Sequence, residues 1–575
     1  MLASALAGIA ACSVPSFDTA EKQPVVANSC KIDADCAPNG ACAGATICVS
    51  STSTLETVVF EVVPPTSAHF GAGDSFLQIA DLSEGTNPRD LTLPPYADVT
   101  GKIVLDSLSL DAYQNLFDGC VNDADSSLPV HVTATRSDSG YGLPTFSVEA
   151  DAAREAGGWR YHLSLPPAFY DLYVTALGDC PMPPVFLPKQ DFTEGAAYAW
   201  PTTISIIELK GSINVSTSES ILGWSIEVLE PVGGKTLSTP RTLKEGPSVP
   251  LGFLFYAQPA DVTKVPLLRI SPPKDVVAPS ILWDMSVIDF DNDHSIGLDI
   301  TQLKWSSTTV RARVESAGSH APIKNASVTL RSTELADAPD GLTAVYETTV
   351  QSDADGMIEA KLVPGTYKLV VVPPDATSAI RQEVWTVAAS STVQAGRTIL
   401  LEPAISVTGS ARDPLQGAGI AGIQVGLAPW GKPASVLETS LGMANVLPRS
   451  ASGLTAADGA FAVGVDPGTF LLSAQTDEAN GFPWLIRTAV EVKADGPQPL
   501  DLGAMTTSYP LVVEGTLRDA WGAVQQARIR AYAPLAANGT SARKGEAVQG
   551  AVLIAETRSN EGGHYRLLLP SQLQK

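Results

Sequence analysis

Short runs of alternating apolar and polar residues, bounded by Gly, Pro, Asn and Asp, extend over most of this 575-residue chain. Alternation of this kind is typical of a strand that buries one of its two faces. The clearest examples lie between residues 308 and 374, where turn residues separate Thr309–Val314, Met357–Leu362 and Tyr367–Val372. We find no stretch with the 3.6-residue period of a convincing amphipathic helix. The pattern therefore predicts an all-β protein.

One opening motif, an apolar residue followed two positions later by Gly, returns about every 100 residues. It occurs at Val99–Gly101, Leu209–Gly211, Val407–Gly409 and Val513–Gly515, with a weaker copy at Val310–Ala312. A period of this length is too long for a solenoid repeat and fits one small β-sandwich per unit. The repeat predicts a β lead-in segment at 58–98 and sandwiches at 99–205, 206–305, 306–404, 405–510 and 511–575, of which the second is the most divergent.

Most units also share a closing motif. In the third unit a turn of the type Asp-Ala-Asp-Gly at 353–356 precedes one strand, and Pro364–Gly365 precedes the final strand. The fourth unit repeats this order with Ala457–Gly459 and Pro467–Gly468. Together with the opening motif, this pattern resembles the carboxypeptidase regulatory-like domain family. The resemblance implies a transthyretin-like sandwich of about seven strands. We therefore expect tandem transthyretin-like or immunoglobulin-like β-sandwich domains in a row, extended as a rod.

The resemblance specifies fold far better than function, because its motifs consist mostly of turn residues. Carboxypeptidases that carry such a domain also carry a zinc-binding H-x-x-E motif. This chain has no such motif, and its six histidines are scattered. The family resemblance thus gives no reason to expect an enzyme.

The fifth unit is predicted to be incomplete. The third and fourth units continue past their hairpin prolines with a closing strand, whereas the fifth reaches Pro570 and then has only Ser571–Lys575. A missing strand would leave backbone groups unpaired along a sheet edge. Either the sequence is a fragment of a longer protein or this unit has lost a strand, and we favour the fragment.

The chain opens with small apolar residues that end at a cysteine. Ile9-Ala10-Ala11-Cys12 resembles the bacterial lipobox, which implies cleavage before Cys12 and lipid attachment to it, although no Lys or Arg precedes Lys22. We assign 1–12 to a signal peptide with a lipobox and 13–29 to a polar tether. The membrane would then be reached only through the lipid anchor, and Ser13 resembles a sorting signal for the outer membrane.

The remaining cysteines indicate an oxidising compartment. There are six besides Cys12, an even number. Four are evenly spaced within residues 30–49, whereas zinc ligands usually occur as close pairs. This segment also resembles short cysteine modules in myxobacterial surface proteins. It is predicted to be a disulfide knot, of a connectivity that the sequence does not give, formed by Cys30, Cys36, Cys42 and Cys48.

Cys120 and Cys180 both lie in the first sandwich and outside the knot. We predict a disulfide between them, which would close a loop of about 60 residues and stabilise the fold by roughly 4 kcal/mol. The alternative is a pair of buried free thiols.

The net charge of −24 opposes binding to nucleic acid, whose phosphates require Lys and Arg. It is compatible with Ca²⁺ or a basic partner, and its simplest role is to keep an exported protein soluble. No run of 18 apolar residues follows the N-terminal stretch, so no membrane-spanning helix is predicted.

Three features could carry chemistry. Asp289, Asp291 and Asp293 have a spacing that can surround Ca²⁺, at a predicted domain junction, although a solvated acidic turn explains them as well. Trp430 lies between Pro and Gly and is the tryptophan most expected to be exposed for sugar stacking. Gly73–Ser75, with Asp291 and His294, is similar to the sequence blocks of GDSL-type hydrolases, but that fold needs helices that this pattern lacks.

The sequence thus favours a non-catalytic, lipid-anchored protein at the surface or in the periplasm of a Gram-negative cell. Its tandem sandwiches would bind a protein or glycan ligand through loops at their ends. The first alternative is an array of carbohydrate-binding modules, and the second is a secreted hydrolase. A structural Ca²⁺ is the one cofactor that the sequence suggests.

Overall fold

The computed structural model describes residues 30–575 except 32, 37–39, 44–46, 68, 123, 138–141, 216–221, 231–233, 240, 244–247, 258–265, 286–293, 301–304, 337–342, 391, 432–445, 477–480, 537–538 and 544–545. These residues form tandem β-sandwiches after a small disulfide knot, which confirms the predicted fold class. The alternation pattern does not predict the α-helix α1 (Ser107–Phe117), which Asp106 caps by accepting a hydrogen bond from the Ser109 amide. Across the described ranges, no helix has the length and apolar character needed to cross a membrane.

The third sandwich shows the common plan most clearly. One sheet has the strand order β25-β21-β28 and the other β24-β22-β26-β27. The first strand pairs antiparallel with the fourth and parallel with the last. The facing sides of the two sheets bury a shared apolar core. The strands are β21 (Thr308–Ser316), β22 (Ser327–Leu335), β24 (Glu347–Gln351), β25 (Met357–Leu362), β26 (Gly365–Val372), β27 (Arg381–Val387) and β28 (Gln394–Leu401).

The fourth sandwich repeats this plan in sheets of order β32-β29-β35 and β31-β30-β33-β34. Its first strand again has an antiparallel neighbour on one side and a parallel neighbour on the other. Its strands are β29 (Ile405–Arg412), β30 (Gln424–Pro429), β31 (Ala451–Leu454), β32 (Ala460–Val465), β33 (Gly468–Gln475), β34 (Leu485–Val492) and β35 (Leu500–Thr506).

The second sandwich has the most divergent sequence but keeps the strand order. It shares the long strand β14 (Ala197–Val215) with the first sandwich, and the second half of β14 pairs with β17 and β20. The short strand β23 (Thr343–Val345) of the third sandwich extends its other sheet. Its further strands are β15 (Ser225–Leu229), β16 (Arg241–Thr242), β17 (Ser248–Ala257), β18 (Leu267–Ser271), β19 (Ser280–Asp284) and β20 (His294–Ile300).

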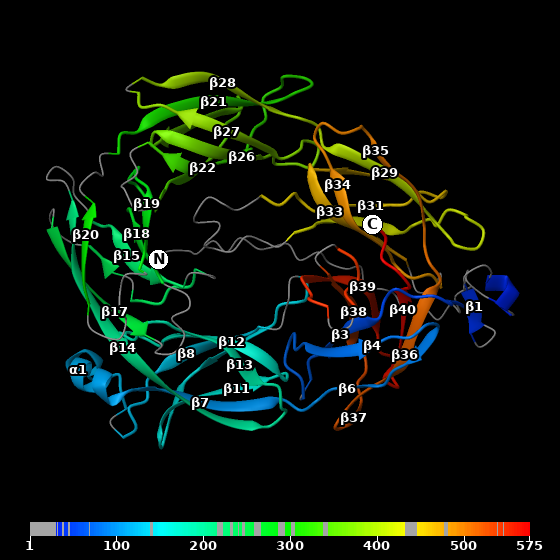
Figure 1. Ribbon diagram of the computed structural model, residues 1–575, viewed down its shortest axis with the longest axis horizontal. Helices are drawn as coiled ribbons and strands as arrows, with labels where there is room; N and C mark the ends of the chain where they lie inside the picture. Colours follow the sequence, from blue (N-terminus) through cyan, green and yellow to red (C-terminus); the bar gives the residue numbers. More distant parts are fainter. Residues whose placement is uncertain are drawn as a thin grey trace.

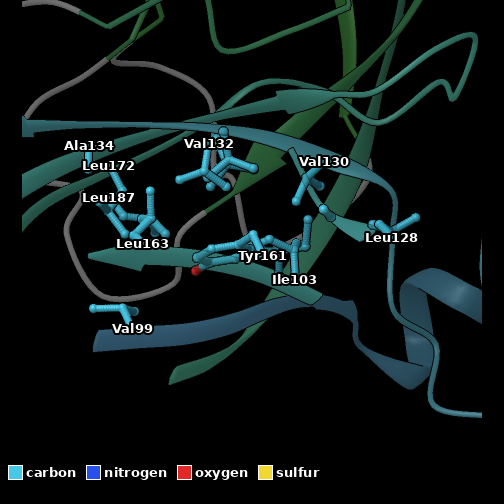
Figure 2. Close-up of a cluster of buried hydrophobic side chains, with 14 of the residues drawn as sticks. Val99, Ile103, Leu128, Val130, Val132, Ala134, Tyr161, Leu163, Leu172 and Leu187 are labelled. Atoms are coloured by element: carbon cyan, nitrogen blue, oxygen red, sulfur yellow. The ribbon is translucent and has the colours of Figure 1, made fainter. Parts of the chain in front are cut away.

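The first sandwich packs β10-β11-β7-β14 against β13-β12-β8-β9. Figure 2 shows Val99 and Ile103 of one sheet facing Val130, Val132 and other apolar side chains between the sheets. Helix α1 connects the first and second strands of this unit. The strands are β7 (Ala97–Leu105), β8 (Val130–Arg136), β9 (Ser147–Asp151), β10 (Ala153–Glu155), β11 (Gly158–Leu165), β12 (Ala168–Ala176), β13 (Val185–Phe192) and the first half of β14.

In the first and fourth sandwiches, the Gly of the opening motif makes room for an aromatic ring on the neighbouring strand. Gly101 lies opposite Tyr161, and a Cβ atom on Gly101 would come within 2.1 Å of that ring. Gly409 lies opposite Phe461, where a Cβ atom would come within 2.9 Å. The third unit has Ala312 in place of Gly, and its partner is the smaller Ile358. The repeated Gly is thus a packing requirement, since interiors leave no space for an added methyl group.

The tyrosine of the closing motif stabilises the preceding hairpin turn through a hydrogen bond from its hydroxyl. The Tyr367 hydroxyl donates to the Val363 carbonyl at 2.6 Å, and the Tyr170 hydroxyl donates to Pro166 at 2.7 Å. Both rings are fully buried, so these bonds satisfy a hydroxyl that would otherwise be buried without a partner.

Residues 511–575 supply only the first four core strands of the fifth sandwich, and residues 57–92 supply the rest. We call residues 57–92 the closure segment. Its strand β3 pairs with β38, β4 pairs with β3, and β5 and β6 pair parallel to β36. The strands are β3 (Thr57–Val63), β4 (Phe76–Asp81), β5 (Thr86–Pro88), β6 (Leu91–Thr92), β36 (Pro510–Asp519), β37 (Gly522–Ala523), β38 (Arg528–Leu535), β39 (Gly550–Arg558) and β40 (His564–Pro570).

This arrangement corrects three expectations. The lead-in segment at 58–98 is not a separate element, because its strands occupy the fifth, sixth and seventh positions of the last sandwich. The predicted unpaired edge in the fifth unit is therefore filled. Ser571–Lys575 does not form a closing strand: Gln574 bridges to Arg487 on the fourth sandwich instead. The expected extended rod is also wrong, since the five sandwiches follow one another around a closed ring (Figure 1).

Each junction in the ring is tied by specific contacts. The single strand β14 continues from the first sandwich into the second, and β19 pairs with β23 between the second and third. Arg449 and Asp466 of the fourth sandwich bind the Ser378 carbonyl and the Ile380 amide of the third. Ile486 of the fourth sandwich packs into the core of the fifth. Consecutive sandwiches in the ring are thus held together by specific contacts at each of these junctions.

The knot contains two crossing disulfides, Cys30–Cys42 and Cys36–Cys48, which confirms the predicted cross-linking. Its elements are η1 (Asp33–Cys36), β1 (Gly40–Ala43) and β2 (Ile47–Ser50). The knot packs against Tyr509, and Ile47 and Val49 contact Val512 and Leu568 of the fifth sandwich. The knot is therefore held at the same sandwich as the closure segment.

Candidate functional site

The junction of the first and fifth sandwiches contains a cluster of buried charged and polar side chains. Strand β3 is buried on both faces: Val58, Phe60 and Val62 enter the core of the fifth sandwich, while Glu61 points out of that core. Glu61 is only 2% exposed. A carboxylate buried to this extent requires close partners, because desolvation is costly for an unpaired charge.

We define the Glu61 cluster as Glu61, Ser75, Arg136, Arg530 and Tyr532. The Ser75 hydroxyl donates to Glu61 Oε1 at 2.8 Å, and the Tyr532 hydroxyl donates to Glu61 Oε2 at 3.0 Å. Arg530 lies 3.4 Å from Glu61 Oε2. Burial and then the charge of Glu61 raise the pKa of Tyr532, so this phenol remains protonated and acts as a donor.

Arg136 connects this cluster to the first sandwich. Its Nη1 donates to the Ser75 carbonyl at 2.8 Å, and its Nη2 donates to the Ser75 hydroxyl at 3.3 Å and to the Pro144 carbonyl at 2.9 Å. The guanidinium also lies 5.8 Å from the centre of the Phe146 ring. Arg136 stands on β8, whereas Ser75 belongs to the closure segment. One side chain therefore links the first sandwich to the closure segment, which forms part of the fifth sandwich.

Apolar contacts surround the cluster. Val59, Tyr532 and Ala551 of the fifth sandwich pack together, with Leu77 and Leu143 against them. Leu143 belongs to the loop between β8 and β9 of the first sandwich. Exclusion of water around charge-assisted hydrogen bonds strengthens them. These contacts close the ring between the fifth sandwich and the first.

Ser75 is not placed as a nucleophile. It is 3% exposed, and its hydroxyl is held between a carboxylate and a guanidinium. The preceding Asp74 accepts hydrogen bonds from the Tyr96 hydroxyl and the Gly71 amide. Burial, and then the carboxylate of Asp74, raise the pKa of Tyr96. Asp74 and Ser75 are thus buried residues that follow an exposed turn at Gly73, which is the structural explanation of the hydrolase-like block.

The predicted Cys120–Cys180 disulfide is wrong in this structure, where both are free thiols. They are neighbours: burial, and then a hydrogen bond with Cys120, raise the pKa of Cys180. A thiol that stays protonated reacts slowly in disulfide exchange. The sequence placed these cysteines correctly in one domain but could not give their oxidation state.

The prediction that Trp430 is exposed is also wrong. The Trp430 side chain is half-buried and packs against the core of the fifth sandwich, at its seam with the fourth. Its amide donates to the Thr469 carbonyl at 2.8 Å. Sequence context could not show this seam, because the covering residues come from another domain.

Two other predictions fall outside the described residues. Asp289, Asp291 and Asp293 lie in the stretch 286–293, and Cys12 lies in residues 1–29. The Ca²⁺ site and the lipid attachment therefore stay predictions.

Sequence reasoning missed the Glu61 cluster, although a signal existed. Glu61 is the one charged residue in the run Thr57–Val63, which is otherwise rich in β-branched and apolar side chains. An acidic residue within such a strand indicates a buried partner. Its partners Arg530 and Tyr532 lie too far along the chain for any local pattern to reveal them.

No family model and no curated protein matches this chain. Solved structures that the comparison finds similar to this chain include a streptococcal ancillary pilin, with 11% identity and a TM-score of 0.19 over 53% of this chain and 99% of that chain. The Bacillus anthracis TIE protein gives 11% identity and a TM-score of 0.17, over 66% of this chain and 69% of that chain. The shaft pilin SpaA of Lactobacillus rhamnosus GG gives 10% identity and a TM-score of 0.15, over 34% of this chain and 98% of that chain.

Proposed function

We propose that this protein is an exported, non-catalytic scaffold that displays a binding surface at the outer membrane or in the periplasm of a Gram-negative cell. The observation that carries the proposal is the closure of five sandwiches into one ring by the strands of the closure segment. Rigid scaffolds of this kind hold loops in fixed positions, and loops are where binding residues concentrate.

The disulfide knot supports export. Two disulfides within residues 30–48 persist only in an oxidising compartment, and about 20 residues cannot form a stable core without cross-links. The knot contacts the fifth sandwich, so a tether attached before residue 30 would leave the ring at that sandwich. An acylated Cys12 would hold this edge of the ring toward the membrane.

The burial of Ser75 and the cluster around it supports a role without catalysis. Side chains that could otherwise perform acid–base or nucleophilic chemistry are used to seal the junction. A fluorophosphonate probe tests this point: we expect no labelling of the folded protein at Ser75, and labelling that is lost in Ser75→Ala would contradict the proposal.

The location is tested by metabolic labelling with a palmitate analogue in a Gram-negative host. We expect label on the wild-type protein in outer-membrane fractions and none on Cys12→Ser, with Cys120→Ser as the matched control that keeps its label. A mature protein that still begins at Met1, or one found in the cytoplasm with the four cysteines of the knot reduced, would overturn the proposed location.

A further inference from the structure

The exposed tip of the hairpin between β36 and β37 carries an aromatic platform. All nine tryptophans of the chain lie in the part that the structure describes, and eight of them are buried or half-buried. Trp521 is the exception, with 65% of its surface exposed. Figure 1 places β37 at the outer rim of the ring. An exposed tryptophan offers a large apolar ring face and a polar N–H to a ligand.

Trp521 is held rigidly. The Asp519 carboxylate accepts hydrogen bonds from the amides of Trp521 and Gly522, both at 2.8 Å, which fixes the four-residue turn. The His69 ring stacks against Trp521, with ring centres 4.1 Å apart and planes inclined by 12°. One face of the indole is therefore covered and the other face is open. A fixed, open aromatic face loses little conformational entropy when it binds a ligand.

The two rings come from opposite ends of the sequence. His69 belongs to the closure segment, and its amide donates to the Ser67 hydroxyl at 3.1 Å. Trp521 belongs to the C-terminal part of the same sandwich. The stacked pair therefore forms only when the ring is closed.

We propose that the open face of Trp521 binds the apolar face of an uncharged hexopyranose in a glycan. This inference names the ligand class of the display function proposed above and rests on it. A single flat indole face matches the flat C–H face of a pyranose whose hydroxyls point outward to water. A nucleic-acid base could also stack, but the net charge of −24 repels its phosphates. The nearby Asp519 and the same net charge oppose contact with an anionic membrane surface.

The test uses the full-length protein and three neutral hexasaccharides: cellohexaose, chitohexaose and laminarihexaose. We expect at least one to bind in calorimetry and to change the tryptophan fluorescence. Trp521→Ala should weaken that binding at least tenfold, and His69→Ala about threefold to tenfold, because the platform is then less well fixed. Leu454→Ala removes an exposed apolar side chain of the fourth sandwich and should leave the affinity unchanged.

Three results would overturn the inference. They are no binding of any of the three probes at 10 mM, equal affinity of the wild type and Trp521→Ala, and binding of phosphatidylglycerol vesicles through Trp521 in place of the saccharides. The Trp521→Ala variant should keep the wild-type thermal midpoint, because the side chain is exposed. Failure here leaves the Cys12 labelling result untouched, so the two proposals are tested separately.

Discussion

At the scale of single residues, the protein uses buried charges to join domains that are distant in sequence. Glu61 near the start of the chain pairs with Arg530 near its end, and Asp466 and Arg449 link the third and fourth sandwiches. Breaking such a pair by removing one partner is costly, because the other charge remains buried. The effect of each substitution should therefore appear at a junction and not within one core.

We expect Glu61→Ala to lower the free energy of unfolding by about 3 kcal/mol, because Ser75, Tyr532 and Arg530 lose their shared acceptor. Urea denaturation of the full-length protein measures this. The control is Glu556→Ala, which removes another partner of Arg530 that is 27% exposed, and should cost less than about 1 kcal/mol. Equal losses in the two variants would show that Glu61 is not the centre of the junction.

The stability of the junction between the third and fourth sandwiches should depend on pH through Asp466. Burial raises the pKa of Asp466, but hydrogen bonds from Arg449 and the Ile380 amide outweigh it and hold the pKa below its ordinary 3.8. A lowered pKa gives stability that is present above about pH 4 and is lost as the pH falls toward the folded-state value. Asp466→Asn should therefore cost about 1–2 kcal/mol at pH 7 and progressively less below pH 4. A difference that stays constant down to pH 2.5 in thermal melts would contradict this.

The two thiols of the first sandwich should react at different rates. Cys180 is 9% exposed and its pKa is raised, whereas Cys120 is partly exposed. The thiolate is the reactive form, so iodoacetamide at pH 7.5 should modify Cys120 first and Cys180 only after denaturation. Peptide mass spectrometry measures the order. Faster labelling of Cys180, or no labelling of either without a reductant, would refute the assignment.

At the scale of elements, the sequence predicts strands well where local pattern determines them. Alternation and turn residues located the hairpin Met357–Val372. The Gly of the opening motif marked four of the five opening strands, and at Gly101 and Gly409 a partner ring needs the space. Helix α1 was not evident, since its capping residue Asp106 follows directly after an alternating strand. The pairing of β3 with β38 could not be predicted at all. It joins Val59 to Tyr532, and no local preference encodes contacts between residues so far apart.

The same limit applies to the candidate sites. Cysteine spacing predicted the knot, because four cysteines so close in sequence must lie close in space. Exposure of tryptophans was not predictable, since domain contacts cover Trp430 and leave Trp521 open. The exposure of each tryptophan depends on where it lies in the ring, and the ring exists only in the folded molecule.

The closure segment should unfold together with the C-terminal strands. Phe60 is fully buried in the core of the fifth sandwich, so Phe60→Ala should cost about 3–5 kcal/mol. Hydrogen exchange should show β3, β38 and β40 losing protection by the same amount, while β7 keeps its protection. The control, Ile79→Ala on β4, removes a side chain that is 75% exposed and should change nothing. Loss of protection in β3 alone would mean that the segment is a separate unit.

At the scale of the whole molecule, closure of the ring restricts the relative motion of all five sandwiches. A chain of domains joined only in sequence would bend at each linker. Here every junction has its own contacts, and the last sandwich cannot form without the closure segment. The stability of the ring and the presentation of Trp521 beside His69 are consequently linked.

Solution scattering distinguishes the ring from the rod that the repeat alone suggests. Five sandwiches of about 30 Å each would extend to about 150 Å as a rod and to about 75–90 Å as a ring. We expect the maximum dimension of the wild type to lie in the range given for the ring. Phe60→Asp places a charge in the core that the closure segment completes, so it should release β3 and raise the maximum dimension above about 100 Å. The control, Ile79→Asp, adds the same charge at an exposed position of the same segment and should keep the wild-type dimension. A wild-type dimension near 150 Å, or equal dimensions for Phe60→Asp and the wild type, would show that the closure segment does not hold the ring together.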